Sequence, residues 1–238
     1  MNRSSHTFRV RIAPGAGVSA IEYPGAASDR LPATLILAHG AGAHQHSPFM
    51  TRYAAGLAAR GLSIVTFNFL YTEQHRRAPD RPTMLEACWR AVVAAVEERA
   101  TPGTRLFGGG KSMGGRIVSQ VAAADGREFP LAGLVFLGYP LHPAGRPETR
   151  RDSHLPRIRV PMLFVQGSRD SLGSPRELGP TLRSLGPQAQ LFTVDGGDHS
   201  FTVPKRWPLA QADIDAQVQD AVRAWVGGVL RREAAGGW

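Results

Sequence analysis

The segment TRLFGGGKSMGG, at residues 104–115, decides the fold class of this chain. Its first four residues predict a short β-strand, and residues 112–124 have the composition of a helix. Between them lies the pattern Gly-x-Ser-x-Gly, with Gly110 and Gly114 on either side of Ser112. A sharp turn from strand to helix holds such a serine with its hydroxyl exposed above a sheet, and glycines are needed because side chains there would collide with neighbouring elements. The segment therefore predicts Ser112 as a nucleophile.

The same residues overlap a second pattern. Gly110-Lys111-Ser112 also ends a phosphate-binding loop of the form Gly-x-x-x-x-Gly-Lys-Ser/Thr, whose first glycine would fall at Arg105. A loop that cradles phosphates needs glycine at its opening turn, so the sequence favours the nucleophile and leaves nucleotide binding as an alternative.

Outward from this segment, strands and helices alternate along the chain. Further apolar stretches that predict strands lie at residues 33–38, 62–69, 131–137, 160–166 and 190–194. Further helical patterns lie at residues 48–60, 82–100, 175–185 and 208–230. This alternation predicts an α/β fold, with a mostly parallel central sheet and helices on both faces.

The two ends of the chain carry their own patterns. Residues 8–23 alternate in polarity around a Pro-Gly turn and predict an N-terminal β-hairpin. No composition break marks a second domain, so we expect a single domain over residues 1–230 and a frayed tail over residues 231–238.

A serine nucleophile needs a base to take its proton and a carboxylate to orient that base. In α/β folds with this serine turn, the carboxylate and then the histidine follow the serine along the chain. Asp170 comes just after an apolar strand, and His199 lies in the glycine-rich loop after the last strand. We therefore predict Ser112, Asp170 and His199 as a catalytic triad. Asp195 and Asp198 share the loop of the histidine and are interpreted as turn residues.

Two backbone N–H groups are expected to bind the oxyanion that forms during the reaction. Met113 opens the helix after the nucleophile, and Ala41 lies in a glycine-containing loop after the strand at 33–38. Residues near strand ends are candidates for the pocket wall: His39, Tyr71, Tyr139 and His142. For His39, a hydrogen bond that stabilises the loop is the preferred alternative. Only 22 residues, 138–159, are available where a cap would be inserted, so we expect no large cap domain.

Composition limits the remaining function classes. With 238 residues, 42% of them hydrophobic, the chain can bury a sizeable core. The net charge of +9 comes from scattered arginines rather than a run of like charges, so no nucleic-acid partner is expected. Six arginines fall in loops on the predicted catalytic side: Arg76, Arg77, Arg81, Arg150, Arg151 and Arg157. A solvated surface and recognition of an anionic substrate are the two alternatives for them.

Targeting signals and cofactor motifs are not visible. The single cysteine, Cys88, excludes an intramolecular disulfide framework, and the sequence has neither a secretory signal nor a long apolar segment. We expect a cytoplasmic protein that takes a small-molecule acyl substrate, with no metal, cofactor or membrane partner.

Four motifs occur in order along the chain: His39-Gly40, Gly-Lys-Ser112-Met-Gly-Gly, Gly-Ser-Arg-Asp170 and Gly-Asp-His199-Ser-Phe. Over about residues 33–228 this order resembles the α/β-hydrolase superfamily. More narrowly it is similar to dienelactone-hydrolase-like proteins, including relatives of a subunit of the animal nonspecific-lethal chromatin complex. The resemblance implies a serine-hydrolase fold that cleaves a small ester or thioester through an acyl-enzyme. True dienelactone hydrolases have a cysteine where this chain has Ser112, and a non-catalytic scaffold that binds a partner is a further alternative.

Overall fold

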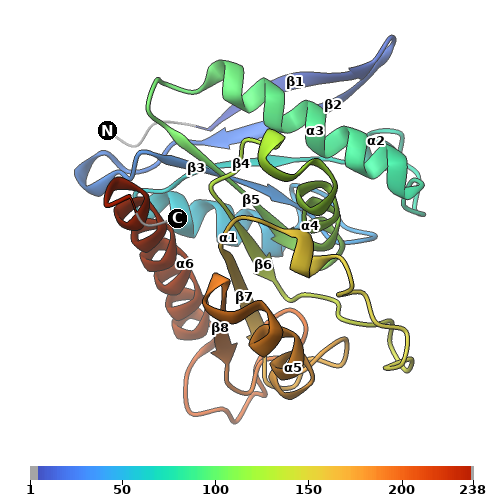
Figure 1. Cartoon of the computed structure of the whole chain (residues 1–238), viewed down its shortest axis with the longest axis vertical. Coiled ribbons are helices and arrows are strands. Elements are labelled where there is room, and N and C mark those ends of the chain that lie inside the picture. The colour runs from blue at the N-terminus through green and yellow to red at the C-terminus, as the bar shows by residue number, and fades with distance from the viewer. Residues whose placement is uncertain (1–4, 237–238) are drawn as a thin grey trace.

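One eight-stranded sheet runs through the centre of the molecule (Figure 1), in a computed structural model that describes residues 5–236. Its strands are β1 (His6–Ala13), β2 (Ala16–Tyr23), β3 (Ala33–Ala38), β4 (Ser63–Phe67), β5 (Arg105–Lys111), β6 (Gly133–Leu137), β7 (Met162–Gly167) and β8 (Ala189–Val194). They lie in the order β1-β2-β4-β3-β5-β6-β7-β8. The strands from β4 to β8 in this order are parallel, whereas β2 pairs antiparallel with both β1 and β4. The predicted hairpin and the mostly parallel sheet are confirmed.

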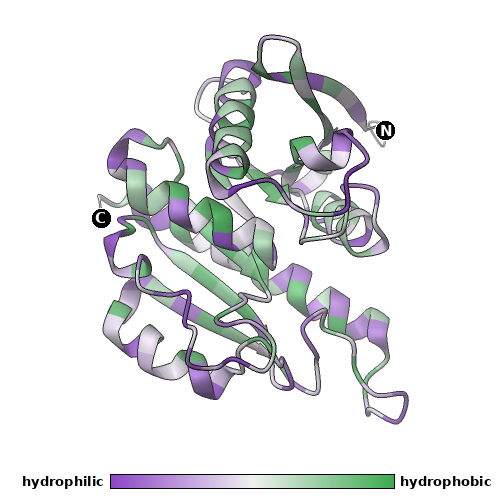
Figure 2. Cartoon of the chain, turned by 90° about the vertical axis from the view of Figure 1, so that its right-hand side faces the viewer, coloured by the Kyte–Doolittle hydropathy of each residue, from purple (hydrophilic) through white to green (hydrophobic). Residues whose placement is uncertain are grey.

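Helices cover both faces of the sheet, as the apolar strands require. They are α1 (Pro48–Ala59), α2 (Leu70–Glu73), α3 (Pro82–Arg99), α4 (Met113–Asp125), α5 (Pro175–Leu185) and α6 (Gln211–Ala234). Along β3, Leu35 and Leu37 join the core beneath α1 and α6, and Ile36 and Ala38 join the core beneath α3 and α4. Figure 2 shows hydrophobic residues along the central strands, and helices that alternate between hydrophobic and hydrophilic residues.

β5 runs to Lys111, four residues further than its sequence predicts. The three glycines at 108–110 continue the ladder to β3 and β6 instead of forming a turn. A Cβ on Gly109 would lie 2.3 Å from the carbonyl oxygen of Val135, so glycine is what allows the strands to approach this closely. Because this backbone is part of the sheet, residues 105–111 do not form the phosphate-binding loop on which the nucleotide-binding alternative rested.

Two other boundaries differ from the sequence patterns. β4 ends at Phe67, two residues before the end of the predicted strand, and the short helix α2 begins at Leu70. Phe69 extends the apolar pattern beyond the residues that pair in the sheet, so the pattern does not mark where the strand ends. The last helix continues to Ala234, and an ion pair of 2.8 Å between Arg105 and Glu233 attaches its final turn to the start of β5. Residues 231–234 are therefore helical rather than frayed, and residues 237–238 of the expected tail lie outside the described residues.

Between β6 and β7 the chain forms no cap domain. The segment contains only one short 3-10 helix, Leu155–Arg157, and His154 beside it attaches the segment to α4 through a 2.7 Å hydrogen bond with Ser119. The expectation of an uncapped sheet edge is confirmed. None of the helices within residues 5–236 combines the length and apolar composition needed to cross a bilayer.

Candidate active site

Ser112 lies at the sharp turn between β5 and α4. Its φ of 50° and ψ of −114° are strained for a residue with a side chain, as they are in a nucleophile elbow. The backbone N–H of Ser112 donates a 3.2 Å hydrogen bond to the carbonyl of Leu137 on β6. A Cβ on Gly110 or on Gly114 would lie 2.4 Å from the carbonyl oxygen of Ala38. Both glycines are therefore required for β3, β5 and α4 to meet beneath the serine.

Asp170 and His199 are joined by a hydrogen bond of 2.7 Å, in which Nδ1 of the ring donates to Oδ2. The carboxylate of Asp170 is fully buried, and it also accepts from Nε2 of Gln166 at 2.7 Å and from the backbone N–H of Leu172 at 2.8 Å. These contacts fix both of its oxygens. The other nitrogen of His199, Nε2, is buried and has no hydrogen-bond partner among the described residues.

The end of β6 brings Ser112 and His199 to the same place. Ser112 bonds to the carbonyl of Leu137, and a Cβ on the next residue, Gly138, would lie 3.3 Å from Nδ1 of His199. Gly138 has a φ of +73°, which glycine adopts without strain. Parallel strands thus carry residues from β5, β7 and β8 to one edge of the sheet, as the sequence predicts.

The carboxylates of the two other acidic residues near His199 have partners other than its ring. Asp198 accepts hydrogen bonds through Oδ1 from the backbone N–H groups of Ser200 at 2.7 Å and Thr202 at 2.9 Å. Asp195 is exposed, and its carboxylate lies 3.4 Å from the hydroxyl of Ser168. Asp198 therefore closes its own turn, as expected of a loop aspartate, whereas Asp195 contacts the loop after β7.

The loop after β3 passes beside the serine. A Cβ on Gly40 would lie 3.6 Å from the Cβ of Ser112, and the backbone N–H of Ala43 donates to the carbonyl of Gly40 at 3.2 Å. This turn contains Ala41, while Met113 is the first residue of α4 and its N–H has no acceptor within the helix. Met113 thus follows Ser112 directly in the chain, and the loop that contains Ala41 passes close to Ser112.

His39 supports that loop from beneath. Its Nδ1 donates to the carbonyl of Gly40 at 2.8 Å, and its Nε2 accepts from the backbone N–H of Phe69 at 3.2 Å. The ring is fully buried, and burial lowers the pKa of His39 to about 4, so it stays neutral at physiological pH. Among the predicted pocket residues, His39 is thus a loop support and does not line a cavity.

A cavity of about 560 Å³ opens next to the loop after β3. Gly42, Ala43 and Tyr71 are among the residues that line it. Tyr139 and His142 do not line this cavity, contrary to the sequence expectation. The buried hydroxyl of Tyr139 donates to the carbonyl of Arg151 at 2.7 Å, and buried His142 lies 3.2 Å from Glu177.

The sequence profile of a family described as the alpha/beta hydrolase domain matches residues 32–227. The chain belongs to the alpha/beta hydrolase family.

Solved structures of other hydrolases share the fold at low sequence identity. A lidless α/β serine hydrolase from Xanthomonas campestris is 22% identical, covers 93% of this chain and 94% of its own, and has a TM-score of 0.70. A dienelactone hydrolase from Anabaena variabilis is 17% identical, and the match covers 92% of this chain and 97% of that protein, with a TM-score of 0.69. The esterase domain of a Rhodothermus marinus protein is 16% identical, and the match covers 94% of this chain and 98% of that domain, with a TM-score of 0.68. These similarities show a common fold over almost the whole chain.

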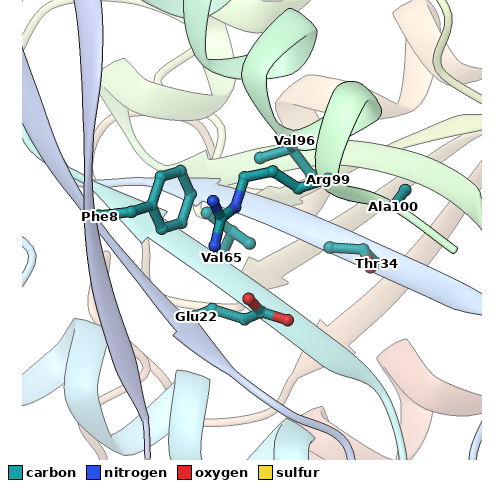
Figure 3. A pocket seen from close by; sticks show the side chains of 7 residues that line it. All are labelled: Phe8, Glu22, Thr34, Val65, Val96, Arg99 and Ala100. Carbon is teal, nitrogen blue, oxygen red and sulfur yellow. The ribbon is translucent and has the colours of Figure 1, made fainter.

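A second, much smaller cavity in this hydrolase lies away from Ser112 (Figure 3). It measures about 30 Å³, and the guanidinium of Arg99 on its wall lies 4.3 Å from the ring centre of Phe8 on the hairpin. Thr34, at the amino end of β3, also lines it. Catalytic groups gather at the carboxyl ends of parallel strands, so this cavity is at the wrong end of the sheet to be part of the site.

The six loop arginines of the hydrolase have different surroundings. Arg76 pairs with Asp80, and Arg150 pairs with Asp152, so a carboxylate already neutralises each of them. The other four have no carboxylate at ion-pair distance within the described part of the chain: Arg77, Arg81, Arg151 and Arg157. Of these four, only Arg77 lines the large cavity.

Two residues of this hydrolase site escaped the sequence analysis. Gln166 ends the apolar run of β7 and is fully buried, and its amide holds Asp170. Lys111 immediately precedes the serine and is also buried, and its ammonium donates a hydrogen bond to the backbone carbonyl of His199. Burial lowers the pKa of Lys111 to about 8. In both cases the available signal was a polar residue at the end of an otherwise apolar strand.

Proposed function

We propose that this hydrolase cleaves a small ester or thioester, with Ser112 as the nucleophile, His199 as the base and Asp170 as the carboxylate that orients the base. The observation that carries the proposal is the state of the His199 ring. Its Nδ1 is fixed by Asp170, and its Nε2 is buried without a partner at the strand end where Ser112 is held. An imidazole with one nitrogen fixed and the other free is arranged to accept a proton from a serine hydroxyl.

The reaction follows in two halves. In the first, Oγ of Ser112 attacks the acyl carbonyl while Nε2 of His199 removes its proton, and the histidine then returns that proton to the departing alcohol or thiol. In the second, His199 removes a proton from water, the water attacks the acyl-enzyme, and the acid is released as Ser112 regains its proton. Asp170 stabilises the imidazolium in both halves without itself taking a proton.

The negative oxygen of each tetrahedral intermediate needs donors that are already in place. The backbone N–H of Met113, at the start of α4, supplies one such donor and benefits from the positive end of the helix dipole. The N–H of Ala41 supplies the second from the loop that packs beside Ser112. Glycines on both sides of Ala41 allow this backbone to come close to a substrate oxygen.

Labelling and turnover together test the proposed chemistry. We expect a fluorophosphonate probe to label the purified protein once per chain, and p-nitrophenyl esters to be hydrolysed with a preference for short acyl chains, because no cap supplies a long apolar tunnel. A thioester series with the same acyl groups separates the two substrate types. A protein that binds neither probe nor ester, yet is folded by circular dichroism, would instead be a non-catalytic scaffold.

The charge of the cavity supports a finer proposal about the substrate. No acidic side chain among the described residues lines it, and four basic residues do: His44, His75, Arg76 and Arg77. Because Asp80 already pairs with Arg76, Arg77 is left to bind a carboxylate or phosphate group of the substrate. A field of one sign in a cleft also raises the association rate of an oppositely charged substrate.

We therefore expect kcat/KM for a carboxylate-bearing ester to exceed that for its neutral isostere, by about tenfold at low ionic strength. The difference between the two kcat/KM values becomes smaller as salt is added, because salt at 0.1 M screens charges over about 10 Å. Arg77→Gln reduces the preference, whereas Arg157→Gln, a second arginine without a carboxylate partner, leaves it in place. If the ratio of the two kcat/KM values does not change with salt and is the same in both variants, these arginines take no part in substrate recognition.

A further inference from the structure

Lys111 is an ionisable side chain in an unusual place. It is the last residue of β5, only 8% exposed, and it directly precedes the nucleophile. Its aliphatic part packs near Gly40, and Nζ lies 5.5 Å from the ring centre of Phe49 on α1. Within residues 5–236 no carboxylate lies at ion-pair distance from it. A buried ammonium without an ion-pair partner lowers the stability of the fold, so another interaction must explain a lysine at this position.

Its hydrogen bond is that interaction. Nζ of Lys111 donates to the backbone carbonyl of His199, which lies 88 residues away along the chain. A Cβ on Gly138 would lie 3.0 Å from this ammonium and 3.3 Å from Nδ1 of the histidine, so the three groups are packed without space between them. Lys111 thus links the strand that presents the nucleophile directly to the loop that carries the base.

We propose that Lys111 is a positioning residue of the reaction, whose ammonium holds the carbonyl of His199 and so sets the place of the imidazole relative to Ser112. The inference rests on the proposed triad. Asp170 fixes the orientation of the ring through Nδ1, but it does not hold the backbone of the histidine loop. A hydrogen bond from a charged donor is about twice as strong as one between neutral groups, which suits it to that task.

The charge of Lys111 depends on the groups that face it. Asp170 and Asp198 favour the ammonium, whereas burial opposes it more strongly and lowers its pKa from 10.5 to about 8. At this side chain the folded protein therefore binds fewer protons than the unfolded chain between about pH 8 and 10.5, and the contribution of Lys111 to stability rises with pH across that window. Below pH 8 the full cost of the buried charge is present, so an apolar replacement of Lys111 relieves it.

Lys111→Met tests the inference because it keeps the length of the side chain and removes both donor and charge. At pH 7 we expect a melting temperature equal to or above that of the wild type, together with a fall in kcat of about tenfold to a hundredfold, since small displacements of catalytic groups carry losses of that size. KM stays within about twofold because Lys111 does not touch the substrate. Lys111→Gln, which restores a neutral donor, recovers part of kcat.

Three results would overturn the inference. They are a wild-type kcat in Lys111→Met, a parallel loss of melting temperature and kcat in that variant, and no recovery of kcat in Lys111→Gln. The rate of fluorophosphonate labelling compares the wild type with both variants in the same way and does not depend on which ester is used as substrate. The free energy of unfolding of the wild type, relative to that of Lys111→Met, is expected to rise between pH 8 and 10.5, which checks that the buried charge is the group removed. Full turnover in Ser112→Ala would defeat the triad itself, whereas unchanged kcat in Lys111→Met, in an enzyme that needs Ser112, defeats only this inference.

Discussion

Ser112→Ala is expected to abolish both fluorophosphonate labelling and ester turnover while the protein remains folded. Loss of a triad nucleophile lowers kcat by about 10⁴–10⁶, and the residual rate comes from binding and the oxyanion donors. The variant adds no bulk and no new backbone strain, because serine already carries a Cβ at a φ of 50°. Steady-state kinetics and circular dichroism on the purified variant provide the measurement.

Ser200→Ala is the matched control for this experiment. Ser200 follows His199 in the same loop, and the hydrogen bond from this residue to Asp198 comes from its backbone N–H rather than its hydroxyl. The control therefore keeps the loop and is expected to retain turnover within a few-fold of the wild type. If Ser112→Ala hydrolysed esters as fast as Ser200→Ala, the nucleophile would have to be sought elsewhere.

Asp170→Asn is expected to lower kcat by about 10⁴-fold with little change in the fold. Asparagine fits the same space, but its amide group faces Nδ1 with a donor and favours the imidazole tautomer that carries its proton on Nε2. In that tautomer His199 cannot accept the proton of Ser112. The kcat of the variant, measured beside its fluorophosphonate labelling rate, reports this loss directly.

Asp198→Asn provides the comparison within the same site. Its remaining side-chain oxygen still accepts from the backbone N–H groups of Ser200 and Thr202, so the turn is kept and kcat changes little. The two substitutions remove the same charge, but only Asp170 contacts the ring of His199. An Asp198→Asn variant more damaged than Asp170→Asn would show that the acid has been assigned to the wrong residue.

The sequence was sufficient wherever a local pattern and the topology of a parallel sheet determined the outcome. The uninterrupted apolar run of β3 identified a central strand, and the Gly-x-Ser-x-Gly turn located the edge at which chemistry gathers. Since parallel strands end at one edge, residues that follow separate strands, such as Asp170 and His199, could be predicted to meet there. Their distance along the chain did not matter, because the sheet itself brings them together.

Contacts that depend on the path of loops could not be predicted in this way. Nothing in the sequence around Lys111 indicates that its side chain reaches the carbonyl of His199, because that contact depends on how the loop after β8 folds back. The same holds for the pocket. Tyr71 and Tyr139 both lie near strand ends. Tyr71 lines the cavity because of how α2 packs, whereas the hydroxyl of Tyr139 bonds to the segment after β6 and the side chain is buried.

The position of β8 at the edge of the sheet has a consequence for how the enzyme responds to heat. β8 pairs only with β7, and most of its residues are at least partly exposed, including Leu191 at 37%. Segments with few buried contacts open locally at a lower free-energy cost than the whole molecule, and their amide protons exchange with solvent sooner. The loop that carries His199 begins where β8 ends, so each such opening would move the proposed base away from Ser112. We therefore expect heat inactivation to follow the hydrogen-exchange rates of β8 and to precede the melting of the central strands.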